Sequence, residues 1–172
     1  IPNSVEVIGG LAFVDCKNLT NIVIPKSVKM IASQTFAGCT NISNIVISDS
    51  VTYIDDSAFL GCTNLKDITI PNSVEVIGRS AFVDCVSLTN LFIPNSVTRI
   101  GDSAFKNCTS LTNVAFSNSM NVIDMDMFRG CTNLTSIIFP NSVKEIAGSA
   151  FRECSSLANI TIPNSVTNIG SY

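Results

Sequence analysis

The sequence predicts a β-rich α/β solenoid, a stack of short coils with parallel strands, and three observations predict it. All seven cysteines lie 23 residues apart, from Cys16 to Cys154. Phenylalanine, isoleucine and serine recur at the same step. The stretch IPNSVEVIG occurs at residues 1–9 and again at residues 70–78, three steps later. A fixed period of this length is typical of repeat proteins whose units stack in one direction.

We expect a single array over residues 1–172, with seven 23-residue units in residues 1–161 and a partial eighth unit in residues 162–172. In such an array each unit packs only on its neighbours. The sequence opens and closes within the repeat, so we expect it to be a segment of a longer chain.

The composition fits this fold and disfavours two classes of partner. Hydrophobic residues make up 46% of the chain and charged residues 13%, which supplies ample apolar material to bury between coils. The net charge is −3, and the ten lysines and arginines are scattered, so we expect no nucleic-acid binding. No apolar run reaches about 18 residues, so we expect no membrane span in this segment.

The first part of each unit is expected to be a strand. Leu88, Leu91 and Ile93 follow the spacing L-x-x-L-x-L, whose last part alternates as a strand does. Pro94 cannot donate a ladder hydrogen bond, so it ends the strand and fixes a corner. A second, shorter extended piece follows at residues 97–100.

The second part of each unit is expected to hold one helical or 3₁₀ turn. Gly101 permits a bend, and Asp102 and Ser103 are good helix N-caps. Phe105 and Cys108 lie three residues apart, so both can face the interior from one turn. Because helical turns need more room than strands, the right-handed coil should curve with its parallel sheet on the concave face and its turns on the convex face.

The unit CTNLKDITIPNSVEVIGRSAFVDC at residues 62–85 resembles the BspA-like class of leucine-rich repeats, with the pattern C-x-x-L-x-x-I-x-I-P-x-S-V-x-x-I-G-x-x-A-F. The resemblance covers all 172 residues. Local departures should alter corners and leave the architecture unchanged. They are Ser48 and Ser117 in place of proline, Met127 in place of alanine, and Ala32, Asp55, Asp124 and Ala147 in place of glycine.

The resemblance implies a function class. BspA-like proteins are associated with the cell surface and with secretion in bacteria and some protists, and with adhesion to host proteins, including extracellular-matrix components. The family has no shared catalytic residues. The resemblance therefore implies a surface or extracellular protein-binding module that is not an enzyme.

Nothing in the sequence points to catalytic, metal or cofactor chemistry. The chain has no histidine, the usual general base, and the uniform cysteine spacing lacks the short intervals of a metal site. The cysteines are best interpreted as a column of small buried side chains without disulfides, and the serines as a column of turn residues. The acidic side chains at the bends could hold Ca²⁺ if the coils aligned them, but Arg79 intervenes, so solvated corners and N-caps are favoured. These side chains are Asp55, Asp56, Asp102, Asp124 and Asp126.

The outward strand positions form the candidate protein-binding surface. One column is polar and nearly uniform, suited to an amide ladder: Asn21, Asn44, Asp67, Asn90, Asn113, Ser136 and Asn159. The adjacent column is largely apolar and varies in size: Val23, Val46, Thr69, Phe92, Ala115, Ile138 and Thr161. An exposed apolar stripe with a polar rim commonly marks an interaction site, with Phe92 and Ile138 as the best anchors. The alternative is that β-branched residues simply favour strands.

Two functions remain open at this point. The first is binding of a protein ligand, such as a host extracellular-matrix or cell-surface protein, by the strand face. The second is structural: Ile1 and Ile162 occupy equivalent positions, and uncapped ends could stack end to end into a filament or larger assembly.

Overall fold

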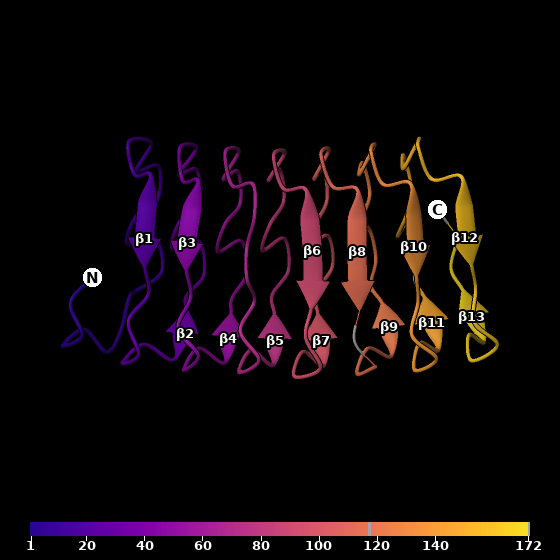
Figure 1. The fold of residues 1–172 in the computed structure, drawn as a ribbon, viewed down its shortest axis with the longest axis horizontal. Helices are drawn as coiled ribbons and strands as arrows, with labels where there is room; N and C mark the ends of the chain where they lie inside the picture. Colours follow the sequence, from indigo (N-terminus) through magenta and orange to yellow (C-terminus); the bar gives the residue numbers. More distant parts are fainter. Residues whose placement is uncertain (117, 172) are drawn as a thin grey trace.

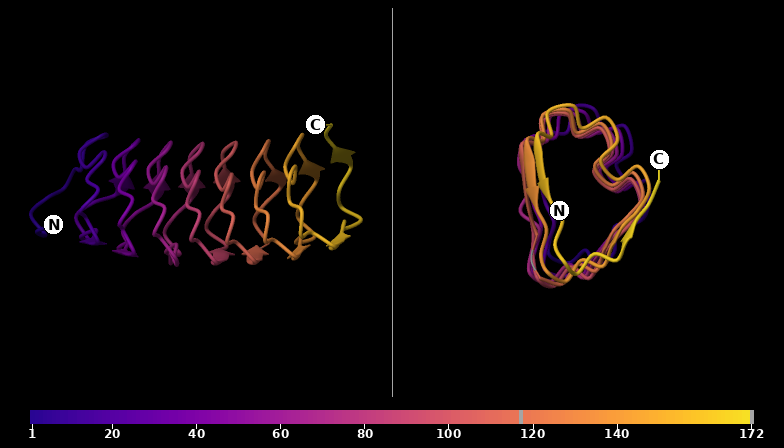
Figure 2. Two further views of the ribbon diagram at one scale, coloured as in Figure 1. Left: turned by 90° about the horizontal axis from the view of Figure 1, so that it is seen from above. Right: turned by 90° about the vertical axis from the view of Figure 1, so that its right-hand side faces the viewer.

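The chain forms a solenoid of parallel strands in the computed structural model, which describes residues 1–116 and 118–171. The coils lie side by side in sequence order (Figure 1). Seen end-on they nearly superimpose, and seen from above they follow an almost straight axis (Figure 2). Among the described residues no helix could span a membrane.

One long side of the stack carries the main strands. All pairings are parallel and join residues 23 positions apart, as Asn21 with Asn44. The strands form a two-stranded sheet, β1–β3, and a four-stranded sheet in the order β12–β10–β8–β6. Their bounds are β1 Asn21–Val23, β3 Asn44–Val46, β6 Asn90–Ile93, β8 Asn113–Phe116, β10 Ser136–Ile138 and β12 Asn159–Thr161. Residues 67–69 lie between the two sheets without an assigned strand.

A second row of two-residue strands follows the proline corner of each coil. It divides into the sheets β2–β4–β5–β7 and β9–β11–β13, again with parallel pairings. The isoleucine that ends each strand faces the interior, except Ile169 in the last coil. The bounds are β2 Met30–Ile31, β4 Tyr53–Ile54, β5 Val76–Ile77, β7 Arg99–Ile100, β9 Val122–Ile123, β11 Glu145–Ile146 and β13 Asn168–Ile169.

The interior consists of columns of identical side chains, as predicted. Five phenylalanines are completely buried: Phe36, Phe59, Phe82, Phe105 and Phe128. Consecutive rings of the column stack with centroids 5.1–5.7 Å apart and planes within 4–12° of parallel. Each ring therefore packs on the equivalent ring of the next coil. One 23-residue period of the sequence thus corresponds to one step along the stack.

The cysteine column is buried except at its first member. All seven thiols are free, and six are buried, but Cys16, in the first coil of this segment, is exposed. The prediction of a fully buried column is wrong at this residue. Each buried thiol also donates to the carbonyl oxygen of the phenylalanine 26 residues earlier. The Sγ···O distances are 2.9–3.3 Å for Cys39, Cys62, Cys85, Cys108, Cys131 and Cys154.

The predicted helical turn on the back of each coil is wrong. The segment after Gly101 is a run of turns, and the residues described contain no helix. Ser103 and Asn107 have φ values of 59° and 60°, in the left-handed region, so neither belongs to an α- or 3₁₀-helix. Asp102 and Ser103 therefore cap no helix.

Hydrogen bonds between coils explain this backbone. The N–H of Ser103 donates to Met125 O in the next coil at 2.8 Å. The N–H of Asn107 likewise donates to Arg129 O at 2.7 Å. Between them, the N–H of Lys106 turns back to Ser103 O at 3.1 Å. Every second N–H thus serves the neighbouring coil, whereas a helix would direct all of them along its own axis.

This pattern also explains the shape of the stack. The expected curvature depended on a wide helical back, but the phenylalanine centroids near the back lie only 5.1–5.7 Å apart. Neighbouring strands lie about 4.8 Å apart, so the two sides differ little in length. The side that carries β1, β3, β6, β8, β10 and β12 is called the strand face below.

The corners match the prediction, except for the role of glycine. The N–H of Val97 closes a turn on Pro94 O at 3.1 Å, and Val51 does the same on Ser48 O at 3.1 Å. Ser48 therefore keeps the corner without proline; Ser117 lies outside the described residues. Gly101 has no left-handed φ. In this coil a Cβ at Gly101 would lie 2.7 Å from the backbone nitrogen of Arg79 in the previous coil.

Candidate protein-binding face

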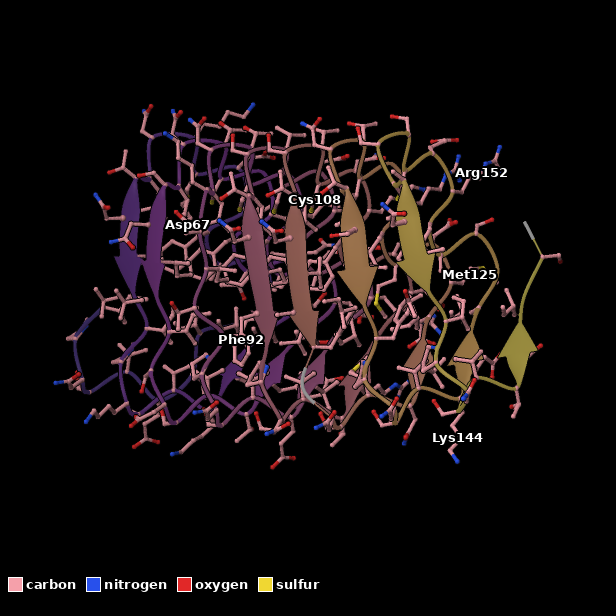
Figure 3. All side chains as sticks on the ribbon, turned by 45° about the vertical axis from the view of Figure 1, so that its right-hand side comes forward. Asp67, Phe92, Cys108, Met125, Lys144 and Arg152 are labelled. Carbon is pink, nitrogen blue, oxygen red and sulfur yellow. The ribbon has the colours of Figure 1, made fainter. Side chains whose placement is uncertain are left out.

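Every residue predicted for the binding surface is exposed. The main strands from β1 to β10 have a buried residue between two exposed neighbours, as in β6, where Leu91 is buried between Asn90 and Phe92. All three residues of β12 are exposed. The largest apolar groups of the outer column are strongly exposed: Ile138 at 80%, Phe92 at 60% and Val23 at 55%. Figure 3 shows Phe92 near the middle of the array.

The register places the members of each column side by side. Phe92 is paired with Ala115, and Ala115 with Ile138. Ile138 is in turn paired with Thr161, and Val23 with Val46. Asp67 and Thr69 belong to the coil without an assigned main strand, yet both are exposed around the buried Ile68. The predicted columns are thus real neighbours in space.

The polar column forms an amide ladder only in part. Asn113 Nδ2 donates to Asn90 Oδ1 at 3.3 Å, which is one direct rung between coils. The amides of Asn21, Asn90 and Asn113 also donate to the hydroxyl of the preceding threonine, each at 3.1 Å. Thr89 Oγ1 donates to Asp67 Oδ1 at 3.3 Å. Local pairing with threonine therefore competes with pairing along the column.

Charge is distributed unevenly over the strand face, a signal that was present in the sequence but missed. Residues 85–98, 107–123 and 130–143, which contain β6, β8 and β10, include no Asp, Glu, Lys or Arg. The earlier coils carry Lys26, Asp49, Lys66 and Asp67 on this side. The part of the face around Phe92 and Ile138 is therefore formally neutral.

A shallow pocket of about 410 Å³ marks the other, charged end of the strand face. Val23 and Val46 form its apolar side, and Lys26 and Asp49 lie at its corner side. Apolar surface and both signs of charge thus meet at β1 and β3.

The buried thiols are protonated structural groups. Burial raises the pKa of Cys62 to about 12 and that of Cys154 to about 11, since a thiolate would lose its hydration inside the stack. Burial also raises the pKa of Cys85 well above its usual value. A thiol needs to become a thiolate to act as a nucleophile, so these groups are inert at neutral pH.

Asp56, Asp102 and Asp126 at the bends are engaged with cations or with backbone N–H groups. Asp56 Oδ1 accepts a hydrogen bond from the N–H of Arg79 at 2.7 Å. Arg79 Nε also lies 3.7 Å from Asp102 Oδ2, and Asp126 pairs with Arg129 at 3.7 Å. In the described part of the chain, no group of three or more His, Cys, Asp or Glu side chains could hold a metal ion.

Comparison with known proteins gives the family. The model of the BspA type leucine rich repeat region matches residues 1–111 and 75–172, in six copies. A search of curated proteins found no match.

Solved structures of bacterial proteins agree with this. The chain is similar to a leucine-rich repeat protein from Bacteroides ovatus, with 38% identity over 95% of this chain and 43% of that one, and a TM-score of 0.91. It is also similar to a leucine-rich repeat protein of T. pallidum, with 32% identity over 88% of this chain and 71% of that one, and a TM-score of 0.83. A leucine-rich cell surface protein from Faecalibacterium prausnitzii is 26% identical over 95% of this chain and 62% of that one, with a TM-score of 0.60.

The chain thus spans less than half the length of the Bacteroides ovatus protein. Its six matched repeats, 23-residue period and parallel strands coincide with one family pattern over the whole segment. The chain belongs to the BspA-type leucine-rich repeat family.

Proposed function

We propose that this segment is a non-enzymatic protein-binding module of the adhesin type, located at the cell surface or outside the cell, and that its strand face recognises the protein ligand. The observation that carries the proposal is the apolar column on that face, with Ile138 80% and Phe92 60% exposed. A cell-surface location is supported by the family and by the similarity to a leucine-rich cell surface protein.

The strand face suits this role because it is rigid. Leu91 and Val114 fix β6 and β8 from inside, and both are buried. The backbone is held by parallel pairing on both sides of β8. A preorganised surface loses little conformational entropy when a ligand binds.

The anchors also supply binding free energy. Complete burial of a large apolar side chain contributes about 1.5–3 kcal/mol. Phe92 and Ile138 are still largely exposed, so a ligand that covers both recovers most of that amount from each. Strand propensity alone would also place β-branched residues in this column, and the experiment below separates the two explanations.

The test measures binding to purified extracellular-matrix proteins by surface plasmon resonance. We expect Phe92→Asp and Ile138→Asp each to weaken binding at least about tenfold, because each buries a carboxylate against the ligand. Met125→Asp is the matched control, since Met125 is 55% exposed but lies outside the strand columns. If the native chain and the three variants all bind equally well, the ligand does not contact this face and the proposal is refuted.

The second candidate function is end-to-end self-association. In this segment, Val7 is 79% and Leu11 55% exposed at one end of the stack, and Ile169 is 62% exposed at the other. Open pockets of about 770 Å³ and about 610 Å³ lie at the two ends. Sedimentation velocity over a range of concentrations tests this function. Self-association that Val7→Asp and Ile169→Asp abolish would support it, and a strictly monomeric segment would refute it.

A further inference from the structure

Ala115 lies between two large apolar side chains on the strand face. The register pairs it with Phe92 on β6 and with Ile138 on β10. Both neighbours project into solvent, being 60% and 80% exposed, whereas Ala115 contributes only a methyl group. We call this arrangement the Ala115 notch: a small floor with an apolar wall on each side.

The notch has the width of a flat ring. Two strand spacings separate the Cα atoms of Phe92 and Ile138 by about 9.6 Å. A ring held between two walls needs about 7–8 Å between wall atoms, because each carbon–carbon contact takes about 3.5–4.0 Å. The spacing of the two strands therefore leaves room for about one aromatic ring between the side chains that project from them. No other three neighbours in this column have two large side chains around a small one: the series runs Val, Val, Thr, Phe, Ala, Ile, Thr.

The notch has a hydrogen-bond acceptor at one end. Asn113 precedes Ala115 by two residues on β8, so it lies on the same face about 6.8 Å away. Its amide nitrogen donates to Asn90 Oδ1 at 3.3 Å and to Thr112 Oγ1 at 3.1 Å. The amide geometry leaves the carbonyl oxygen of Asn113 as the group that can accept from a ligand. This spacing along the strand is comparable to the length of a tyrosine side chain, so a ring over Ala115 can bring its hydroxyl near Asn113.

The three strands that form the notch carry no charged residue. Residues 85–98, 107–123 and 130–143 are free of Asp, Glu, Lys and Arg. A charged group buried there would lose hydration without gaining a counter-charge, which is costly. The face is therefore matched to an uncharged segment of a partner.

We propose that the Ala115 notch receives a tyrosine side chain of the protein ligand, carried on a segment without charged residues, with the ring between Phe92 and Ile138 and the hydroxyl donating to Asn113. This inference rests on the proposed function and specifies its ligand. Tyrosine suits the site because it combines a large apolar ring with one polar group at its end.

The test uses capped glycine–serine peptides that differ only in one central residue, which is tyrosine, phenylalanine, lysine or glutamate. Binding is measured from chemical-shift changes of the Ala115 and Ile138 methyl and backbone amide signals in NMR titrations up to millimolar peptide. We expect the tyrosine peptide to bind most tightly, the phenylalanine peptide more weakly, and the charged peptides to give no shift. Absence of a shift with the tyrosine peptide would overturn the proposal.

Variants separate the notch from the rest of the column. Ala115→Leu fills the floor and should weaken binding of the tyrosine peptide about tenfold or more. Thr69→Leu, in the same column two coils earlier, is the control and should change nothing. Phe92→Ala removes one wall without adding bulk and should also weaken binding. If Ala115→Leu binds as the native chain does, the notch is not the site.

The hydroxyl is tested through the preference for tyrosine over phenylalanine. Asn113→Ala should abolish this preference, whereas Asn44→Ala, at the equivalent position of β3, should preserve it. A preference that survives Asn113→Ala would overturn the assigned acceptor. Neutral oligosaccharides also combine a ring with hydroxyl groups; if chitotriose shifts the same methyl signals at lower concentration than the tyrosine peptide, the tyrosine proposal is refuted.

The outcomes also distinguish this inference from the proposed function. Matrix-protein binding that is lost in Phe92→Asp but retained in Ala115→Leu would refute the notch and leave the strand face as the binding site. Specific binding of the tyrosine peptide without any binding of matrix proteins would support the notch and refute the matrix-protein ligand.

Discussion

The interior columns and the outer column of the strand face obey the same 23-residue period, but they differ in what the period preserves. The interior repeats one side chain, as in the stacked phenylalanines from Phe13 to Phe151. The outer column runs from Val23 through Phe92 and Ala115 to Thr161 and changes almost at every coil. Packing against an identical neighbour fixes the interior residue, whereas solvent imposes no such restraint. The residues that vary between coils therefore lie on the surface that a ligand could contact.

The largest expected effect is unfolding at alkaline pH, which disrupts the interior columns. Burial raises the pKa of all six covered thiols, that of Cys62 from 9.0 to about 12. The unfolded chain thus releases these protons at lower pH than the folded chain. The stabilisation is complete below pH 9 and is lost as the pH rises from 9 through 12.

We expect cooperative unfolding within that pH range, followed by circular dichroism. Cys62→Ala should move the transition to higher pH, because one thiol no longer drives it. Cys16→Ala is the matched control, since Cys16 is exposed, and should leave the transition where it is. A transition indifferent to both substitutions would show that the buried thiols do not control it.

The next largest effect compares two phenylalanines directly. Phe82 is completely buried between the rings of Phe59 and Phe105, whereas Phe92 is 60% exposed. Phe82→Ala should lower the free energy of unfolding by about 3–5 kcal/mol, because it leaves a cavity in the column. Phe92→Ala should change it by less than about 0.5 kcal/mol. Urea unfolding measures both, and similar losses would mean that the outer column is part of the structural core.

These contrasts were largely predictable from sequence because they follow from the period. The spacing placed the phenylalanine, isoleucine and cysteine columns inside and the outer strand positions in solvent. The exposure of Cys16 and Ile169 was missed because the same residue type occurs at the equivalent position of every coil, whether or not a neighbouring coil covers it. The Ala115 notch needed the register, which turns residues 23 positions apart into direct neighbours.

The helical turn was predicted wrongly because Phe105 and Cys108 can share one side of a helix or of consecutive turns. The difference lies in the left-handed residues, which are stabilised by hydrogen bonds to the next coil. A signal for them exists in the sequence, since the position of Asn107 is rich in the residues that tolerate positive φ. The column reads Asp15, Gly38, Gly61, Asp84, Asn107, Gly130 and Glu153.

A smaller effect concerns the thiol hydrogen bond inside the column. Cys85 Sγ donates to Phe59 O at 3.2 Å in a fully buried site. Cys85→Ser keeps a donor but places a more strongly hydrated hydroxyl among apolar groups, so it should cost about 1–3 kcal/mol. Cys16→Ser, at the uncovered end, should cost nearly nothing. Chemical denaturation of the two variants checks this, and equal stabilities would show that the thiol column tolerates polarity.

The smallest effects on stability are expected from the ion pairs on the back of the coils. Substitutions of two arginines compare an exposed pair with a less exposed network. Arg79 lies 3.7 Å from Asp102, and both side chains are well exposed, so Arg79→Ala should change the free energy of unfolding by less than about 0.5 kcal/mol. Arg129 is less exposed and reaches Glu153 at 3.2 Å and Asp126 at 3.7 Å. A network of this kind holds its charges more firmly than an isolated pair, so Arg129→Ala should lower the stability more than Arg79→Ala does. Thermal unfolding at low and high salt separates the two, because salt should reduce the Arg129 effect. If both substitutions were equally neutral at every salt concentration, the columns inside the coils would account for the stability without help from the charged surface.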